Sequence, residues 1–331
     1  MPKWSARSSE AAGFLASLVF TGLAAVRDVY FGGLFQSTSP LGVAVVAFTL
    51  CSVIFLPIAL TRSPASVRLL LRHRRELFWV NVTTGLAWIS FFYALRTIEP
   101  LLVQILFAGV GPLSVLWIDR FVGLTPSATL SQAERPIYIG LVVSLLVAAT
   151  VAVAGLSGAG PMPLGTAALG VALAAGAGTS ISVSTVLSRR LNDRGVPPAA
   201  LISLRFVGAV ALAATLSVAS GAGVLTVFAK PDVTVVLGAA LLLIVLPNYV
   251  NQVGIPLVSP LTVSAVMALG PVLIFGLQLV EGRLSPSPSS LAAAVLYGIF
   301  AVAAALARGG HSISRVSTSF KTVFGWRNVD V

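Results

Sequence analysis

Two charged residues stand side by side in an apolar stretch near the start of the chain. Arg27 and Asp28 lie within residues 12–34, a stretch long enough to cross a membrane as a helix. Charges in the membrane interior are costly, and they usually face a cavity or a partner. Neighbouring helix residues point about 100° apart, so the two side chains need not pair. Either they form an internal or interfacial ion pair, or Asp28 binds a proton or cation and Arg27 anchors an anionic group of a substrate.

Two further polar residues lie inside apolar stretches. Arg205 belongs to residues 199–219, and Gln104 belongs to residues 100–122. Arg205 either extends to the membrane interface and caps helix carbonyls, or contacts a substrate and holds one conformation. Gln104 needs a hydrogen-bond partner in an apolar medium, so it is a weaker candidate for substrate binding.

Residues 248–252 concentrate hydrogen-bonding side chains within the apolar stretch 233–254. Asn248, Asn251 and Gln252 share one helix face, with Tyr249 beside them. Because amides need partners in an apolar medium, this face favours substrate binding. Hydrogen bonding between helices is the alternative.

Aromatic residues gather in the stretch 77–98. Trp88 and Phe92 are four residues apart, so they lie on the same helix face. They form either a stacking wall for a flat or apolar substrate, or an aromatic patch that faces lipid or the protein core.

Three prolines, Pro112, Pro247 and Pro271, fall inside predicted helices. Each removes a backbone hydrogen bond and frees carbonyl groups. We expect either static kinks or hinges whose free carbonyls line a cavity.

The sequence contains no motif for metal, nucleotide or nucleophilic chemistry. His73 and His311 lie in basic segments outside the spans, and Cys51 is the single cysteine. No GxxxxGK[ST] loop is present, and no Ser, His and Asp set can be assembled inside the spans. We therefore expect no enzyme, no cofactor, no metal site and no nucleotide-driven pump.

The composition places these residues in a membrane. Of 331 residues, 57% are hydrophobic and 9% are charged, and the mean hydropathy is +0.98. Soluble proteins carry about 25% charged residues, so this chain cannot form a soluble surface. The sequence predicts an all-α integral membrane protein with ten transmembrane helices. The predicted spans are residues 12–34, 41–60, 77–98, 100–122, 137–156, 164–187, 199–219, 233–254, 260–281 and 287–307.

Basic residues outside the spans or near their ends fall almost entirely on one side. With ten spans both termini share a side, and that side has sixteen Lys and Arg residues against three on the other. Arg27 and Arg205, inside the spans, complete the total of 21. This bias predicts that both termini are cytoplasmic, in a plasma or inner membrane. The net charge of +11 therefore sets orientation, and we expect no nucleic-acid partner.

The chain also contains a weak internal repeat. Aligning Pro100 with Pro260 carries Pro40 onto Pro198 within two residues. Each half has five spans, an odd number, so the second half is inverted, and a site is expected between the halves. The predicted organisation is a cytoplasmic N-terminus (residues 1–11), a first five-helix repeat (12–156), a second five-helix repeat (157–307) and a basic cytoplasmic tail (308–331).

Together these features resemble the drug/metabolite transporter (DMT) superfamily, in particular its EamA-type members with ten helices. The resembling motifs are ALRTI at 94–98 with Pro112, IPLVS at 255–259 with Pro271, LISLRF at 201–206 and LVEGRLSPS at 279–287. Within them, Arg205 matches an intramembrane arginine and Glu281 an acid of the family pattern. The first half departs from it, because Ala47 stands where an arginine would match Arg205. The resemblance implies a substrate pathway between the halves and export or exchange of small metabolites.

We therefore expect a secondary transporter, an exporter or exchanger, that moves small organic metabolites by alternating access. Its partners would be a small-molecule substrate, membrane lipid and, if transport is coupled, a proton or other ion at Asp28. One alternative is a membrane-embedded enzyme or lipid-handling protein, in which the basic segment from Arg62 to Arg75 holds a phosphate head group. Another is a sensor or assembly subunit without transport.

Overall fold

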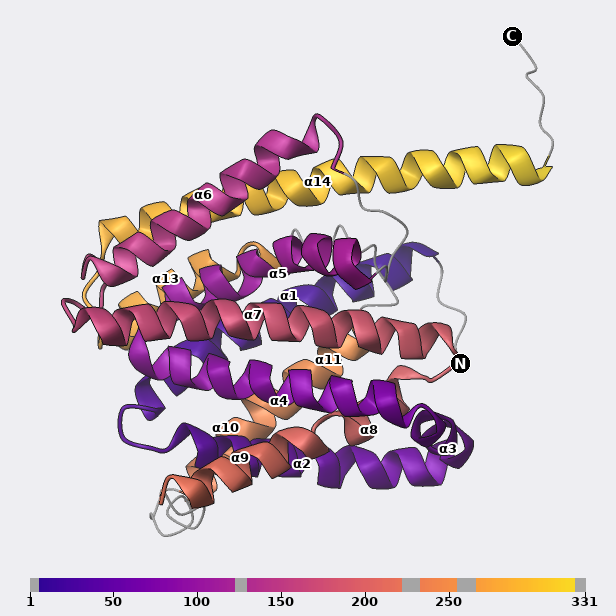
Figure 1. Ribbon diagram of the computed structural model, residues 1–331, viewed down its shortest axis with the longest axis horizontal. Coiled ribbons are helices and arrows are strands. Elements are labelled where there is room, and N and C mark those ends of the chain that lie inside the picture. The colour runs from indigo at the N-terminus through magenta and orange to yellow at the C-terminus, as the bar shows by residue number, and fades with distance from the viewer. Residues whose placement is uncertain (1–5, 123–129, 222–232, 255–265, 325–331) are drawn as a thin grey trace.

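The computed structural model describes residues 6–122, 130–221, 233–254 and 266–324, in which every regular element is a helix (Figure 1). The first part of the chain forms α1 (Ala6–Leu34), α2 (Pro40–Arg62), α3 (Pro64–Arg72), α4 (Arg74–Thr97), α5 (Pro100–Val122) and α6 (Glu134–Val153). The second part forms α7 (Leu164–Asp193), α8 (Pro198–Arg205), α9 (Val207–Ala219), α10 (Val233–Ala240), η2 (Leu241–Val245), α11 (Leu246–Gly254), α13 (Gly270–Glu281) and α14 (Pro288–Phe324).

Within these ranges, eight helical segments are long and apolar enough to cross a membrane. Two shorter apolar segments, Thr234–Val250 and Gly270–Glu281, accompany them. Large apolar side chains cover the flanks of the bundle, and Val218 and Val280 are 75% and 85% exposed. Such a surface requires lipid around it, so the chain is a helical, multi-pass membrane protein.

Several helix bounds differ from the predicted spans. The span 199–219 is interrupted at Phe206, which separates α8 from α9. The segment from Arg62 to Arg75, expected to be a loop, contains the short helix α3. The last span does not end at residue 307, because α14 continues to Phe324. By contrast, α5 has the predicted bounds, 100–122.

The break between α8 and α9 is stabilised by a side chain of α4. The Asn81 amide oxygen accepts the backbone N–H of Gly208 at 2.7 Å, and the Asn81 amide nitrogen donates to the carbonyl of Leu77 at 2.9 Å. A side chain at Gly208 would collide with Asn81, since a Cβ there would lie 2.6 Å from the Asn81 Cβ. Asn81 therefore satisfies a backbone donor that the interrupted helix leaves without its usual acceptor.

The three prolines predicted to lie inside helices occupy different settings. Pro112 lies within α5. Pro247 follows the π-helical turn η2, in which the N–H of Leu246 donates to the carbonyl of Leu241. Such turns relieve the clash and the lost bond that proline introduces. Pro271 corrects the expectation, because it lies in the first turn of α13, where a missing N–H is harmless.

Small residues let α7 pack closely against α4 and α5. Gly178 on α7 is buried, and a Cβ there would lie 2.3 Å from the carbonyl oxygen of Phe107 on α5. On the far side of α4, a Cβ at Gly85 would lie 3.2 Å from the Cα of Ala209. Close backbone approach at small residues is how helices associate in lipid. α4 therefore packs between α7 and α9.

The variant Gly178→Ala is expected to lower the stability of the bundle. The added methyl group must displace the α5 backbone, and overpacking of this kind costs about 1–3 kcal/mol. The matched control is Gly176→Ala on the same helix, where nothing lies within 4 Å of the added Cβ. Thermal unfolding in detergent should show a lower midpoint for Gly178→Ala alone. Equal midpoints would contradict the packing described here.

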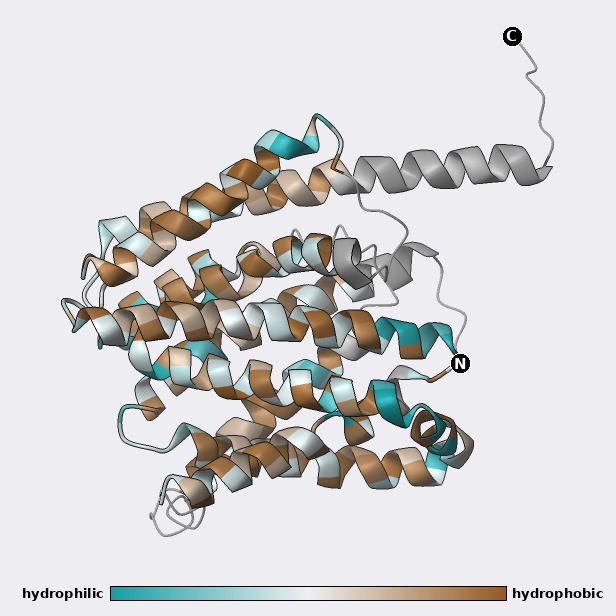
Figure 2. Cartoon of the chain, viewed as in Figure 1, coloured by the Kyte–Doolittle hydropathy of each residue, from teal (hydrophilic) through white to brown (hydrophobic). Residues whose placement is uncertain are grey.

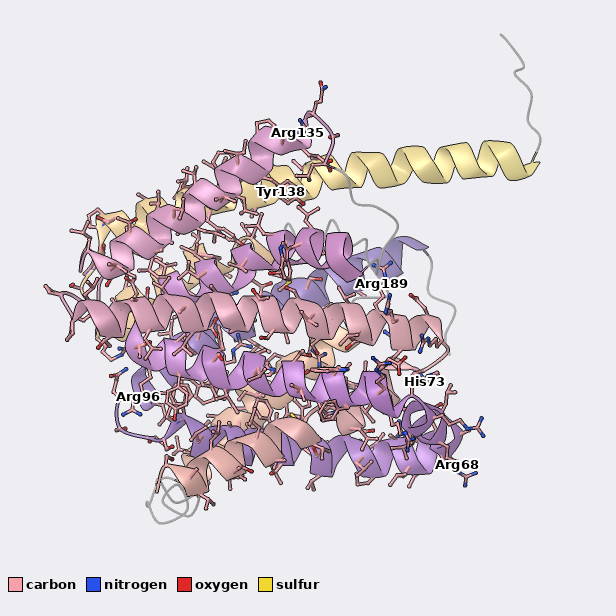
Figure 3. The ribbon with its side chains drawn as sticks, viewed as in Figure 1. Arg68, His73, Arg96, Arg135, Tyr138 and Arg189 are labelled. Carbon is pink, nitrogen blue, oxygen red and sulfur yellow. The ribbon has the colours of Figure 1, made fainter. Side chains whose placement is uncertain are left out.

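The two ends of the bundle differ in charge. Arg68, His73 and Arg189 lie at one end, which we call the basic end, and Arg96 lies at the opposite end (Figure 3). Hydrophilic residues gather at the basic end near α3, and hydrophobic residues follow the helices between the ends (Figure 2). Figure 1 shows α3 nearly end-on, so it runs across the basic end rather than along the bundle.

Candidate functional site

Arg27 and Asp28 form an ion pair inside the bundle. The Arg27 Nε and Nη2 atoms both lie 2.7 Å from the Asp28 Oδ1 atom, and the two residues are 5% and 0% exposed. Of the alternatives that the sequence left open for Arg27 and Asp28, the structure shows the internal ion pair. The Arg27 guanidinium also lies 5.1 Å from the ring centre of Trp88 and 5.3 Å from that of Phe91. Aromatic faces stabilise a desolvated cation, so both Asp28 and α4 hold Arg27 in place.

The second carboxylate oxygen of Asp28, Oδ2, does not share in the contact with Arg27. Asp28 Oδ2 is buried, and no described residue forms a hydrogen bond with it. A buried polar atom without a partner costs about 1–3 kcal/mol, and more when it is charged. Asp28 is therefore only half satisfied by Arg27, and its free oxygen is available to a further group.

A small hollow lies between α1, α5 and α13, one helical turn from Asp28. Thr21, Ala24 and Ala25 line it from α1, Gln104 from α5, and Gly270 and Ile274 from α13, with Phe20 and Met267. Asp28 stands three and four residues after Ala25 and Ala24, so it continues the face of α1 that lines the hollow. The hollow is partly open, and its accessible space fits about one water molecule.

Two glutamines complete this arrangement. Gln104 is 7% exposed, and its Oε1 atom has no hydrogen-bond partner among the described residues. Gln278 on α13 is 3% exposed, and both its Oε1 and its Nε2 lack partners in the same part of the chain. Gln278 follows Ile274 by four residues, so it lies one turn further along the α13 face that lines the hollow.

Asp28, Gln104 and Gln278 therefore come from three helices that pack against one another, α1, α5 and α13. We call these three residues the central site. Together they present carboxylate and amide oxygens and one amide donor that the described protein leaves unused. Such buried atoms in a native protein call for an explanation, and a bound polar molecule supplies one.

Gln278 was not among the residues singled out from the sequence. Its signal was available, because it is an amide inside an apolar helix, like Gln104. What the sequence does not contain is the packing of α13, the helix of Gln278, against α1, the helix of Asp28.

Arg205 lies elsewhere, at the carboxyl end of α8, and joins three helices. Its Nε donates to the Thr84 hydroxyl of α4 at 3.1 Å, and its Nη2 donates to the Ser184 hydroxyl of α7 at 3.2 Å. The two hydroxyls also bond each other at 2.7 Å. Arg205 is only partly buried, and no salt bridge with an acid of the described residues is formed. It is a link between helices rather than a part of the central site.

The predicted aromatic wall forms part of a larger cluster. Phe92 is fully buried and packs with Phe48, whose ring stacks on Phe206 at 5.2 Å between centres. Trp88 is partly exposed and contacts Arg27, the ion-pair partner of Asp28. Neither Trp88 nor Phe92 lines the hollow.

The amide-rich segment of α11 is only partly described. The Asn248 amide nitrogen donates to the carbonyl of Ile244 in its own helix at 2.8 Å. Tyr249 is 52% exposed and stacks on Phe55 of α2. The side chains of Asn251 and Gln252 lie outside the described residues. Asn248 therefore satisfies the backbone near Pro247, and the structure does not bring it to the hollow.

At the end opposite the basic end, α1 is packed tightly. A Cβ at Gly32 would lie 2.7 Å from the ring of Pro100 and 3.3 Å from the Arg283 guanidinium. Arg283 pairs with Glu281 at 3.1 Å, and a Cβ at Gly33 would lie 2.9 Å from Glu281. Two glycines thus allow α1 to close against α5 and α13 at this end.

Comparison with known proteins shows a shared fold. No protein-family model matches the chain. No curated protein matches it either. Among the solved structures that match the chain is "Crystal structure of protein", with a TM-score of 0.59 and 22% sequence identity. The match covers 92% of this chain and 99% of that chain, so the two share their overall architecture.

Proposed function

We propose that this chain is a secondary transporter of small organic metabolites that works by alternating access, as a member of the DMT superfamily. In this proposal ten helical crossings form two inverted five-helix repeats. α1, α2, α4, α5 and α6 make the first repeat. α7, α8–α9, α10–α11, α13 and α14 make the second.

The pattern of helix contacts supports inverted repeats. α7 packs on α4 and α5, and the equivalent helix α1 packs on α11 and α13. The pairs that a two-fold axis would map onto themselves, α2 with α9, α5 with α13 and α6 with α14, are also in contact. An axis in the membrane plane relates the halves in such a fold, and substrate sites lie between them.

Charge supports a cytoplasmic basic end. Arg68, His73 and Arg189 lie there, and Arg96 lies at the opposite end (Figure 3). Short basic loops remain in the cytoplasm during insertion, so both termini are assigned to that side of a cell membrane. The end closed by Gly32 and Gly33 then faces outward.

The central site carries the functional proposal. α1 and α5 belong to the first proposed repeat and α13 to the second, so Asp28, Gln104 and Gln278 meet where the repeats join. Their unused polar atoms suit a solute with both hydrogen-bond donors and acceptors. A carrier needs polar groups that the closed protein leaves unsatisfied, because its solute must satisfy them in turn.

The variant Gln278→Met tests this role, since it is expected to separate stability from transport. Removing an amide without partners should leave the unfolding midpoint unchanged or raise it. Loss of its hydrogen bonds to the solute, about 1.5 kcal/mol or more, should slow transport about tenfold or further. Counterflow of a labelled solute, chosen by thermal shift from a metabolite panel, measures transport in proteoliposomes.

The matched control is Val280→Met on the lipid-facing side of the same helix. It should transport normally. Loss of stability in Gln278→Met with normal counterflow would make Gln278 a structural residue. Absence of counterflow in the native protein, together with product formation in detergent, would favour a membrane enzyme instead.

A further inference from the structure

A second buried carboxylate lies at the end of the bundle that Gly32 and Gly33 close. Glu99, between α4 and α5, is 3% exposed. Its Oε2 atom accepts the backbone N–H of Gly158 at 2.8 Å and the hydroxyl of Ser290 at 2.6 Å. Gly158 lies between α6 and α7, and Ser290 lies in the first turn of α14. One carboxylate oxygen thus joins three separate parts of the chain.

Further hydrogen bonds tighten the same contact. The backbone N–H and the hydroxyl of Ser285 each donate to the carbonyl of Gly158 at 3.2 Å. The Ser287 hydroxyl donates to the carbonyl of Leu156 at 2.6 Å and accepts the N–H of Ser290 at 3.1 Å. We call Glu99, Ser285, Ser287, Ser290 and the backbone of residues 156–158 the Glu99 cluster. Its hydrogen bonds join the α4–α5, α6–α7 and α13–α14 connections to one another.

No cation of the described residues compensates the Glu99 charge. The charged groups of the neighbouring elements are Arg96 on α4, Glu281 at the end of α13 and Arg283 in the α13–α14 connection, and none forms a salt bridge with Glu99. The α6–α7 connection, the end of α1 and the first turns of α5 and α14 contain no charged residue. Asp28 differs, because Arg27 pairs with it.

The geometry leaves room for a proton. Both hydrogen bonds of the carboxylate go to Oε2, so Oε1 can carry a proton without breaking either one. Burial raises the pKa of Glu99, although the bonds from Ser290 and Gly158 oppose that shift. A carboxyl group whose pKa is raised in the closed structure stabilises that structure at low pH. The stabilisation is lost as the pH rises through the raised pKa.

We propose that Glu99 is a proton-binding site that latches this end of the protein. With the proton bound, the Glu99 cluster holds the three connections together. Without it, a buried anion that lacks a cation draws water into the cluster and loosens the connections. Acid at this end therefore keeps it closed and alkali opens it. Proton binding at Glu99 does not involve the solute, so this proposal can be tested separately from the proposed transport.

Cysteine accessibility tests the latch. Ser157 is buried beside Gly158, and its hydroxyl has no partner among the described residues, so Ser157→Cys removes no hydrogen bond seen there. With Cys51 replaced by Ala, this cysteine is the single thiol. The rate of maleimide labelling in detergent is measured between about pH 5 and pH 9, with either Glu99 or Glu99→Gln. At each pH the labelling rate with Glu99 is divided by the labelling rate with Glu99→Gln. This ratio cancels the pH dependence of the thiol reaction itself.

We expect the rate with Glu99, divided by the rate with Glu99→Gln, to be near one at the acid end and to rise about tenfold toward the alkaline end, as the carboxyl group loses its proton. A cysteine at Ser63, at the basic end, should show a constant ratio. In Ser290→Ala, a weakened latch should raise labelling at low pH. A flat ratio at Ser157→Cys would overturn the proposal. So would fast labelling of Glu99→Gln at every pH, because the ionised carboxylate would then be the closing form.

Discussion

Replacing Arg27 with Leu is expected to destabilise the folded protein by about 3–5 kcal/mol, because it strands a buried carboxylate. Asp28 is fully buried and its Oδ2 atom already lacks a partner among the described residues. Without Arg27, Oδ1 loses both of its bonds from the guanidinium as well. The packing of Arg27 against Trp88 and Phe91 is lost at the same time. The loss should appear as a lower unfolding midpoint in detergent.

A double-mutant cycle separates the ion pair from the packing. The variant Arg27→Leu with Asp28→Leu removes both charges, and replacing a whole buried pair with apolar residues is often neutral or stabilising. The double variant should therefore be more stable than either single variant. Simple addition of the two single losses would contradict the pairing, since residues that interact do not add. Transport should fail in all three variants, because the central site loses Asp28 or its orientation.

The cycle also bears on proton coupling at Asp28. In proteoliposomes with an imposed pH gradient, Asp28→Asn should lose gradient dependence if Asp28 carries the coupled proton. Asp28 is paired with Arg27, whereas Glu99 forms no salt bridge with a cation of the described residues. Unchanged gradient dependence in Asp28→Asn would exclude Asp28 as the coupling residue.

The sequence predicts the membrane class and most helix bounds because these follow from local chemistry. A long apolar run must be helical in lipid, and prolines such as Pro40, Pro100 and Pro288 stand where helices begin. The break at Phe206 could not be predicted in this way. It depends on Asn81, more than a hundred residues earlier, which accepts the Gly208 N–H from a neighbouring helix.

The candidate site shows the same division. Arg27, Asp28 and Gln104 are detectable as polar residues in apolar runs. Their partners are not, because pairing depends on rotamers and on which helices meet. Gln278 becomes informative only when α13 packs on α1. In the sequence, Glu99 stands at the end of a predicted helix. Its burial beneath residues 156–158 and α14 depends on tertiary packing, so the sequence does not predict it.

Arg205 carries the second large expected effect, which falls on transport rather than on stability. Its guanidinium bonds to Thr84 on α4 and Ser184 on α7, and these two hydroxyls already satisfy each other. In Arg205→Met the hydroxyl pair remains, and a partly buried charge without an acid partner among the described residues is removed. The unfolding midpoint should therefore change little.

Transport in Arg205→Met should nevertheless fall about tenfold to a hundredfold. Hydrogen bonds from a charged group contribute about 1.5–3 kcal/mol, enough to bias the bundle toward the conformation in which α4, α7 and α8 are joined. Arg205→Lys should transport at an intermediate rate, because one ammonium cannot reproduce the two-pronged contact. Counterflow in proteoliposomes measures the effect, and Thr185→Val, on an exposed side of α7, is the control. Normal counterflow in Arg205→Met would show that the link is dispensable, whereas a collapse of the midpoint would make it structural.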